Sequence, residues 1–220
     1  MGKTAIILGA TGLTGSLLLE KLIADERYDT IKLISRKTIN SSSNKVQEHL
    51  GDLLNLDKFK SVFFGDEVYC CIGTTASKTK DKNTYKAIDY GIPIAAAKLA
   101  RENDISTFMV ISAMGANPNS GIFYNRTKGE MEQAVFSEKI DHTYILRPSL
   151  ITGNRKEKRA GEKIAIIAFR FLDLLMVGSL KKYKSIPAES IAQAMINLAN
   201  KDYNESMIIS DKIKEIAKKE

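Results

Sequence analysis

Short apolar segments alternate with longer segments of helical periodicity as far as Pro148. Apolar runs of strand length predict β-strands, and apolar residues that recur every three or four positions predict helices between them. Strands separated by helices are typical of βαβ units with right-handed crossovers, which build a parallel sheet covered on both faces. The predicted strands span 4–10, 30–36, 45–52, 66–73, 106–113 and 142–147, and the predicted helices span 12–26, 56–62, 83–103 and 124–138.

The pattern changes after Pro148, where a basic loop follows the last of these strands. The later segments are an apolar helix at 162–178, a helix at 187–200, a short strand at 207–210 and a charged tail. No internal repeat or low-complexity linker divides the chain. We therefore predict a single α/β domain over 1–220, a doubly wound parallel sheet in which 149–220 add a small C-terminal cap on the substrate side.

Composition narrows the class of protein. The chain has 220 residues, of which 44% are hydrophobic and 27% charged, as expected of a globular domain rather than a disordered one. Its net charge of +7 favours anionic partners, and a nucleotide cofactor satisfies that preference as well as nucleic acid does. The basic residues are scattered and no nucleic-acid-binding motif accompanies them, so we do not expect nucleic-acid binding.

Cysteine and histidine usage gives no indication of a disulfide or a metal site. Cys70 and Cys71 are neighbours on a strand and point to opposite faces, and His49 and His142 lack the spacing of metal ligands. The longest apolar run, at 164–177, is too short to span a bilayer and carries an arginine and an aspartate. The N-terminus starts a strand pattern with no signal peptide, so we predict a cytoplasmic protein without a membrane span.

The first predicted strand runs into the glycine-rich stretch GATGLTG, and a helix follows. Gly9 allows a tight turn, Gly12 lets the backbone approach a pyrophosphate, and Gly15 lets the helix pack close to the strand. The helix N-terminus adds free N–H groups and the positive end of the helix dipole. This context predicts a dinucleotide-binding loop, and the alternative is a structural turn that binds no ligand.

The second predicted strand ends in Ser35, Arg36 and Lys37. An acidic residue at this place hydrogen-bonds the ribose 2′-hydroxyl of NAD, whereas arginine pairs with a 2′-phosphate and stacks on adenine. The basic strand end therefore favours NADP(H) over NAD(H). The alternative is that Arg36 is a solvated loop residue.

Tyr124 and Lys128 stand four positions apart at the start of the helix that follows the fifth predicted strand. Carbonyl reduction needs a proton donor, and the pKa of a free tyrosine is about 10. A nearby Lys128 ammonium and the positive charge of an oxidised nicotinamide would lower the pKa of Tyr124, and Ser112 would hold the carbonyl oxygen. The alternative is an ordinary polar helix face.

These motifs are similar to those of the atypical short-chain dehydrogenase/reductase superfamily, which has the Rossmann fold. More narrowly, the sequence resembles the Tat-interactive-protein oxidoreductase family of NADP-binding proteins. The resemblance is carried by 7–22, 68–78, 109–132 and 145–159.

The resemblance implies a cofactor site residue by residue. The phosphate-binding positions are Gly9, Thr11, Gly12, Leu13 and Gly15. The positions at the 2′-phosphate, adenine and ribose are Arg36 with Lys37, Asp52 with Leu53, and Gly73 with Thr74. The turn that holds nicotinamide is Pro148, Ser149, Leu150 and Ile151, and the catalytic positions are Ser112, Tyr124 and Lys128. The nearest counterpart of the superfamily's helix asparagine is Asn83, and Ala113 stands where many relatives have a further serine.

Together these features predict an NADP(H)-binding oxidoreductase that reduces a carbonyl or oxidises an alcohol of a small molecule. The alternative is a non-catalytic NADP(H)-binding regulator or assembly factor, in which bound cofactor alters a surface for a protein partner. We expect the substrate pocket to form from 114–123, 150–165 and the apolar helix. A homodimer is compatible with either interpretation.

Overall fold

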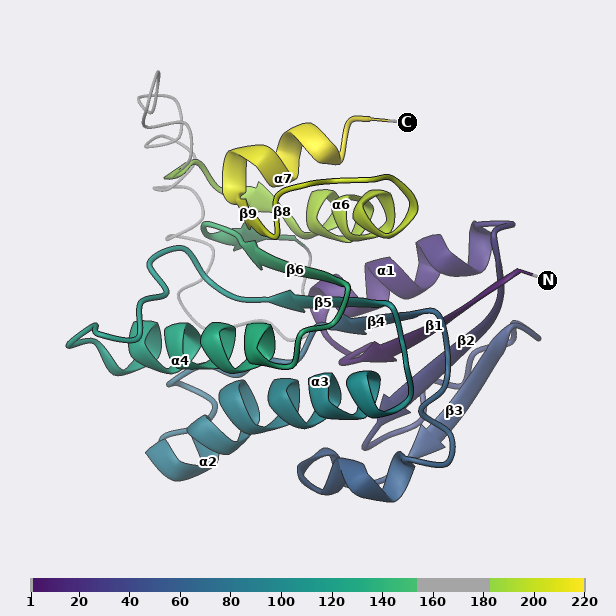
Figure 1. Cartoon of the computed structure of the whole chain (residues 1–220), viewed down its shortest axis with the longest axis horizontal. Helices are drawn as coiled ribbons and strands as arrows, with labels where there is room; N and C mark the ends of the chain where they lie inside the picture. The colour runs from purple at the N-terminus through teal and green to yellow at the C-terminus, as the bar shows by residue number, and fades with distance from the viewer. Residues whose placement is uncertain (1, 154–182, 220) are drawn as a thin grey trace.

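A computed structural model of the protein describes residues 2–153 and 183–219, and its main body is one parallel sheet (Figure 1). The sheet has 7 strands in the order β3-β2-β1-β4-β5-β6-β9. Every neighbouring pair is parallel, so all carboxyl ends lie along one edge. The strands are β1 (Lys3–Leu8), β2 (Tyr28–Ser35), β3 (Val46–Leu50), β4 (Glu67–Cys70), β5 (Thr107–Ile111), β6 (His142–Arg147) and β9 (Met207–Ile209).

Helices connect these strands in the predicted alternation. They are α1 (Leu13–Ala24), the 3₁₀ helix η1 (Leu53–Phe59), α2 (Lys82–Lys86), the π-helical segment η2 (Ala87–Gly91), α3 (Ile92–Glu102), α4 (Phe123–Ser137), α6 (Ala188–Asn200) and α7 (Ser210–Ile216). The helix predicted for 83–103 therefore contains a π-helical turn. The helix predicted for 56–62 starts earlier, because the Asp52 carboxylate accepts the Leu54 N–H at 3.0 Å and caps its first turn.

Alternating side chains of the strands form two separate apolar layers. In β1, Ala5 and Ile7 pack with α1, α6 and α7, whereas Ile6 and Leu8 pack with η1, α3 and α4. Figure 1 shows these two sets of helices on opposite faces of the sheet. The doubly wound Rossmann fold predicted from the sequence is confirmed.

The cap predicted for 149–220 is built differently in its described part. β9 pairs with β6 as the last strand of the main sheet, and α6 packs against α1 and α7 on one face. The charged tail forms α7, which buries Ile213. Beyond the carboxyl end of β6, β7 (Ile151–Thr152) and β8 (Ile186–Pro187) form a two-stranded parallel sheet. The apolar helix predicted at 162–178 lies outside the described residues.

A buried carboxylate joins several strands at the amino edge of the sheet. Glu67 is 1% exposed and accepts hydrogen bonds from the hydroxyls of Tyr28 and Tyr69 at 2.7 and 2.5 Å. The Lys3 ammonium lies 2.6 Å from the other carboxylate oxygen. Burial, followed by the charge of Glu67, raises the pKa of both tyrosines, so both hydroxyls remain donors.

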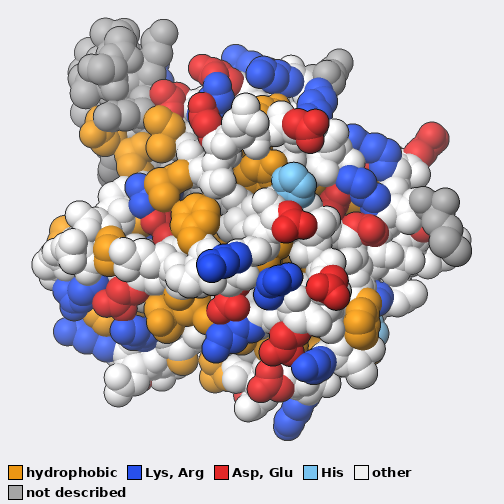
Figure 2. Space-filling model, in the orientation of Figure 1, with side chains coloured by type: hydrophobic (Ala, Val, Ile, Leu, Met, Phe, Trp, Pro, Cys, Tyr) orange, Lys and Arg blue, Asp and Glu red, His pale blue; other side chains and the backbone are white. Residues whose placement is uncertain are grey.

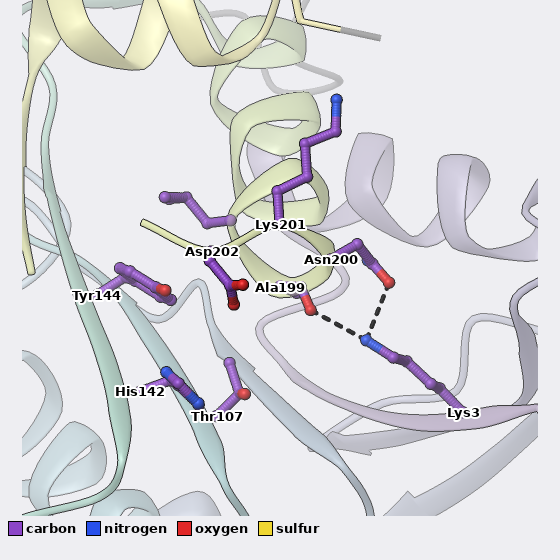
Figure 3. A pocket seen from close by; sticks show the side chains of 9 residues that line it. Lys3, Thr107, His142, Tyr144, Ala199, Asn200, Lys201 and Asp202 are labelled. Carbon is purple, nitrogen blue, oxygen red and sulfur yellow. Dashed lines mark hydrogen bonds between the residues drawn. The ribbon is translucent and has the colours of Figure 1, made fainter. Parts of the chain in front are cut away.

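The same lysine ties the end of α6 to this edge. Lys3 donates to the Ala199 carbonyl and to the Asn200 side chain, both at 2.9 Å (Figure 3). These contacts border a polar cavity of about 280 Å³, which His142 and Asp202 also line. Because the cavity lies at the amino ends of β1, β5 and β6, it is separate from the edge where the predicted cofactor residues gather.

Replacing Lys3 by methionine should lower the free energy of unfolding by about 1–3 kcal/mol, because Glu67 loses its charged partner in a buried setting. Urea unfolding followed by circular dichroism measures the loss. Lys21→Met is the matched control, because Lys21 pairs with an exposed carboxylate, that of Glu189, at 3.3 Å from its ammonium. This variant should change the free energy of unfolding by less than about 1 kcal/mol. Equal losses in the two variants would contradict the importance of this network.

Candidate active site

The predicted cofactor residues converge on the place where the strand order reverses. β1 lies between β2 and β4, so the connections from the two halves of the sheet run in opposite directions and leave a crevice at the carboxyl ends. The Cys71 N–H donates to the Leu8 carbonyl at 2.9 Å, which holds the ends of β1 and β4 together. The glycine loop and Gly73 follow these two strand ends and border the crevice.

The glycine loop is compact because two of its glycines cannot carry a side chain. Gly9 has a φ of +89°, and a Cβ there would lie 2.9 Å from the carbonyl group of Cys71. A Cβ on Gly15 would lie 2.2 Å from the Gly9 carbonyl oxygen. Helix α1 therefore approaches the turn more closely than any other residue would allow.

Gly12 is less crowded than Gly9 and Gly15. A Cβ there would meet only the Gly9 carbonyl oxygen, at 3.2 Å, among the described residues. Gly12 is the N-cap of α1 and provides no side-chain cap, so the first N–H groups of the helix are available to a ligand. These features form a cradle that fits a pyrophosphate.

The basic strand end and the residues after β3 lie next along the same edge. Arg36 and Lys37 are exposed just beyond β2, and Asp52 is exposed just beyond β3. The Leu53 side chain is 5% exposed and packs in the apolar layer with η1 and α3. Only the backbone of Leu53 is therefore placed to contact a ligand.

Asp89 is a site residue that we did not predict from the sequence. It is fully buried in the π-helical segment η2 and accepts the Thr74 N–H at 2.7 Å, which orders the loop after β4. Asn83, which we considered as the helix asparagine, is instead exposed on α2. Asp89 stands four positions after the buried Tyr85 and three before the buried Ile92, so helical spacing is compatible with an inward position, but the sequence gave no sign of its partner Lys128.

Lys128 projects from α4 into the interior beside this carboxylate. It is 3% exposed, and its ammonium donates to the Ile111 carbonyl at 3.3 Å. The ammonium also lies 2.9 Å from Asp89 Oδ1, an ion pair in which Oδ1 accepts no aligned hydrogen bond from the described residues. The Lys128 nitrogen is 3.9 Å from the position that a Cβ on Gly73 would occupy, so it borders the crevice.

Tyr124 lies one turn before Lys128 on α4 and is 39% exposed. Its ring packs edge-on against Tyr85, with 6.5 Å between the ring centroids. Burial raises the pKa of Tyr124, the Lys128 ammonium lowers it, and the Asp89 carboxylate raises it, with a net rise. The fall in pKa that we predicted therefore depends on an additional positive charge, such as that of an oxidised nicotinamide.

Ser112 is placed differently from the role that we predicted for it. Its side chain is 4% exposed, and its hydroxyl donates to the Glu132 carboxylate at 2.5 Å. Glu132 is also held by Arg147, whose Nε donates at 2.9 Å and whose Nη2 contacts the second oxygen. Because a serine hydroxyl has a single proton, Ser112 in this arrangement has none to donate to a substrate oxygen.

Two further features of α4 were missed from the sequence. The buried Glu132 and the partly buried Arg147 form an ion pair that joins α4 to the end of β6. A Cβ on Gly129 would lie 2.2 Å from the backbone nitrogen of Pro118, so this glycine lets the loop after β5 cross α4 next to Lys128. Of these features, only Gly129 could have been noticed in the sequence. Glycine lowers the stability of a helix interior, so its presence there indicates that another chain segment packs closely against it.

The turn after β6 closes the other side of the site. The buried Pro148 accepts the Met114 N–H at 3.0 Å, and Ser149 donates its hydroxyl to the Lys184 carbonyl. Leu150 is 44% exposed, and Ile151 begins β7. A Cβ on Gly153 would lie 3.1 Å from the Leu13 side chain, so this turn comes back against the glycine loop.

Comparison with known proteins agrees with this cradle. A family model described as NAD(P)H-binding matches residues 9–202. The chain belongs to the NAD(P)H-binding family. Protein FMP52, mitochondrial, from Candida albicans is 34% identical over 91% of this chain and 90% of its own length. Protein HTATIP2 from Rattus norvegicus is 30% identical over 89% of this chain and 80% of its own length.

These relatives identify this NAD(P)H-binding protein as a member of the same atypical short-chain dehydrogenase/reductase family, as the resemblance implied. The fold also matches solved structures at low identity. A UDP-N-acetylglucosamine 4-epimerase from Methanobrevibacter ruminantium superposes with a TM-score of 0.72 at 19% identity, over 94% of this chain and 76% of that chain. The Bordetella bronchiseptica enzyme WbmG in complex with NAD superposes with a TM-score of 0.70 at 14% identity, over 99% of this chain and 76% of that chain.

No helix within residues 2–153 and 183–219 is long and apolar enough to cross a bilayer.

The two glycines should respond differently to substitution. Gly12→Val should keep the thermal midpoint within about 2 °C of the wild type while abolishing stabilisation by NADPH, because its side chain would fill the pyrophosphate space. Gly15→Ala should lower the midpoint itself by about 4 °C or more, because its Cβ meets backbone. Thermal shift with and without NADPH measures both. Retained stabilisation of Gly12→Val by NADPH would show that the loop does not contact phosphate.

Proposed function

We propose that this protein is an NADP(H)-dependent oxidoreductase that reduces a carbonyl group of a small molecule or oxidises the corresponding alcohol. The observation that carries the proposal is the Lys128 ammonium, which borders the crevice at Gly73 while Tyr124 stands one turn away on the same helix. A dinucleotide cradle and an acid–base pair thus share one edge of the sheet. This combination is what carbonyl reduction requires.

The side chains divide the work of such a reaction. A bound NADPH supplies the hydride. The first turn of α1 and the glycine loop bind the pyrophosphate, and Arg36 binds the 2′-phosphate. Tyr124 donates its phenolic proton to the carbonyl oxygen, and Lys128 orients the cofactor ribose through an N–H that its protein partners leave available. With Ser112 bonded to Glu132, polarisation of the carbonyl rests mainly on Tyr124.

The exposed side chains around the pair favour a substrate with an apolar portion. Ile122 at the N-cap of α4 is 63% exposed and Leu150 after β6 is 44% exposed. Both follow carboxyl strand ends, as Tyr124 does. Apolar side chains that border a few polar groups are typical of small-molecule sites.

A second candidate function is a non-catalytic NADP(H)-binding regulator with a protein partner. It is favoured by the bond from Ser112 to Glu132, which leaves the catalytic set incomplete. Nucleic-acid binding has less support, because on the face shown in Figure 2 basic side chains are interspersed with acidic ones. For location, the cytoplasm is our proposal from the sequence, whereas the FMP52 relatives carry a mitochondrial name.

Cofactor choice tests the role of Arg36. Wild-type protein should bind NADPH at least about tenfold more tightly than NADH, since a charge-assisted bond contributes about 1.5–3 kcal/mol. Arg36→Asp should remove or reverse this preference by repelling the 2′-phosphate. Calorimetric titration with both cofactors measures it, and Lys98→Asp, which makes the same charge change on the exposed face of α3, should retain it. Equal affinities of the wild type for both cofactors would rule out the assignment.

Removing one hydroxyl separates an enzyme from a sensor. Tyr124→Phe should bind NADPH with near-normal affinity while carbonyl turnover falls by about 10²–10⁴, the usual contribution of general acid–base catalysis. NADPH oxidation at 340 nm against a panel of aldehydes and ketones measures it. Tyr203→Phe, in the segment between α6 and β9, is the control and should turn over normally. A wild type that oxidises no NADPH with any carbonyl would favour the regulator.

A further inference from the structure

The ion pair beneath Tyr124 has a structure that points to a specific task. Asp89 is fully buried, and its two carboxylate oxygens serve different partners. Oδ2 accepts the Thr74 N–H at 2.7 Å, and Oδ1 lies 2.9 Å from the Lys128 ammonium. One side chain thus connects the loop after β4 with the helix that carries the acid–base pair.

Asp89 lies in a segment whose backbone departs from an α-helix. Ala87–Gly91 is π-helical, between the regular turns of α2 and α3. A π turn inserts one residue into a helix and is found frequently at functional sites.

Three side chains from three elements surround or influence Tyr124: two through their charge and one through a ring contact. Lys128 comes from α4, Asp89 from η2 and Tyr85 from α2. The charges of Lys128 and Asp89 oppose each other at Tyr124, and burial adds to the effect of Asp89. The lysine that would otherwise promote phenolate is therefore compensated by a carboxylate in contact with it.

We propose that Asp89 is a positioning residue that fixes Lys128 at the crevice and neutralises its charge, so that Tyr124 keeps its proton and acts as a donor. This inference rests on the proposed function only for its consequence, that alcohol oxidation needs a higher pH than carbonyl reduction does. In reduction the proton moves from the Tyr124 oxygen to the carbonyl oxygen, and the phenolate left behind recovers a proton from water. Alcohol oxidation begins from phenolate, which this arrangement disfavours.

A purely structural role would have a different signature. A buried pair can often be replaced by apolar residues without loss of stability, whereas removal of one partner leaves an uncompensated charge. Both roles therefore predict a stability change when Asp89 is altered. Only the positioning role predicts that the ionisation of Tyr124 changes as well.

The ionisation of Tyr124 can be followed by NMR in protein carrying ¹³Cζ-tyrosine, with Tyr124→Phe identifying the signal. In wild-type protein without cofactor we expect a pKa above the usual value of about 10. Asp89→Asn keeps an oxygen for the Thr74 N–H and removes the charge, so the Tyr124 pKa should fall by at least about one unit. Asp81→Asn, which alters the exposed N-cap of α2, should leave it unchanged.

A second set of variants covers the case in which Asp89→Asn does not fold. Lys128→Met should raise the Tyr124 pKa, and adding Asp89→Asn to it should bring the pKa back towards the wild-type value. The double variant removes both charges and is expected to fold. An unchanged Tyr124 pKa after adding Asp89→Asn to either background, or an equal shift in Asp81→Asn, would overturn the proposal.

The titration needs neither cofactor nor substrate, so its outcome is independent of the proposed function. The expected shifts in a protein that oxidises no NADPH would support the role of Asp89 and reject the enzyme. If the protein turns over but the Tyr124 pKa does not change in Asp89→Asn, the enzyme is supported and the role of Asp89 is rejected. With an alcohol and NADP⁺, Asp89→Asn should move the rising limb of the rate profile to lower pH by the same shift, and Asp81→Asn should not move it.

Discussion

The close approach of α1 to the turn after β1 is the constraint on which the candidate site depends. The backbone meets at Gly15 and Gly9 at a distance that excludes even a methyl group. This contact aims the first turn of α1 into the crevice between β1 and β4, while the positive φ of Gly9 brings the turn against Cys71. The pyrophosphate cradle of the glycine loop takes its shape from that junction.

Three buried carboxylates organise the remainder of the molecule in a common manner. Glu67 holds the amino edge, whereas Asp89 and Glu132 hold the carboxyl edge. Each has a cationic partner, Lys3, Lys128 and Arg147 respectively, and each also accepts a hydrogen bond from another element. Buried ion pairs add little net stability by themselves, so their value lies in fixing which elements meet. The apolar layers stabilise the fold, and the carboxylates determine which elements contact one another.

The sequence predicted the sheet well, because alternating burial is imposed on each strand by its two covering layers. The glycine loop could be predicted equally well, because its glycines are required by backbone contacts close to the loop itself. The directions of individual side chains were harder to predict. Leu53 and Ser112 stand at predicted strand ends, yet one enters the core and the other bonds to Glu132. Asp89 escaped prediction because its partner Lys128 is remote in sequence, and local helical spacing does not show which carboxylate will meet a buried lysine.

The contacts of Lys3 also bear on how the chain folds during synthesis. Its partners on α6 lie 196 and 197 positions away, although β1 is an inner strand of the sheet. Contacts between such remote positions slow the conformational search, because a long loop must close first. At about 5–20 residues per second, a ribosome needs many seconds to deliver Asn200 after Lys3. During that interval Lys3 lacks its partners at the end of α6. The junction of β1 with the end of α6 therefore forms only after most of the chain has been synthesised.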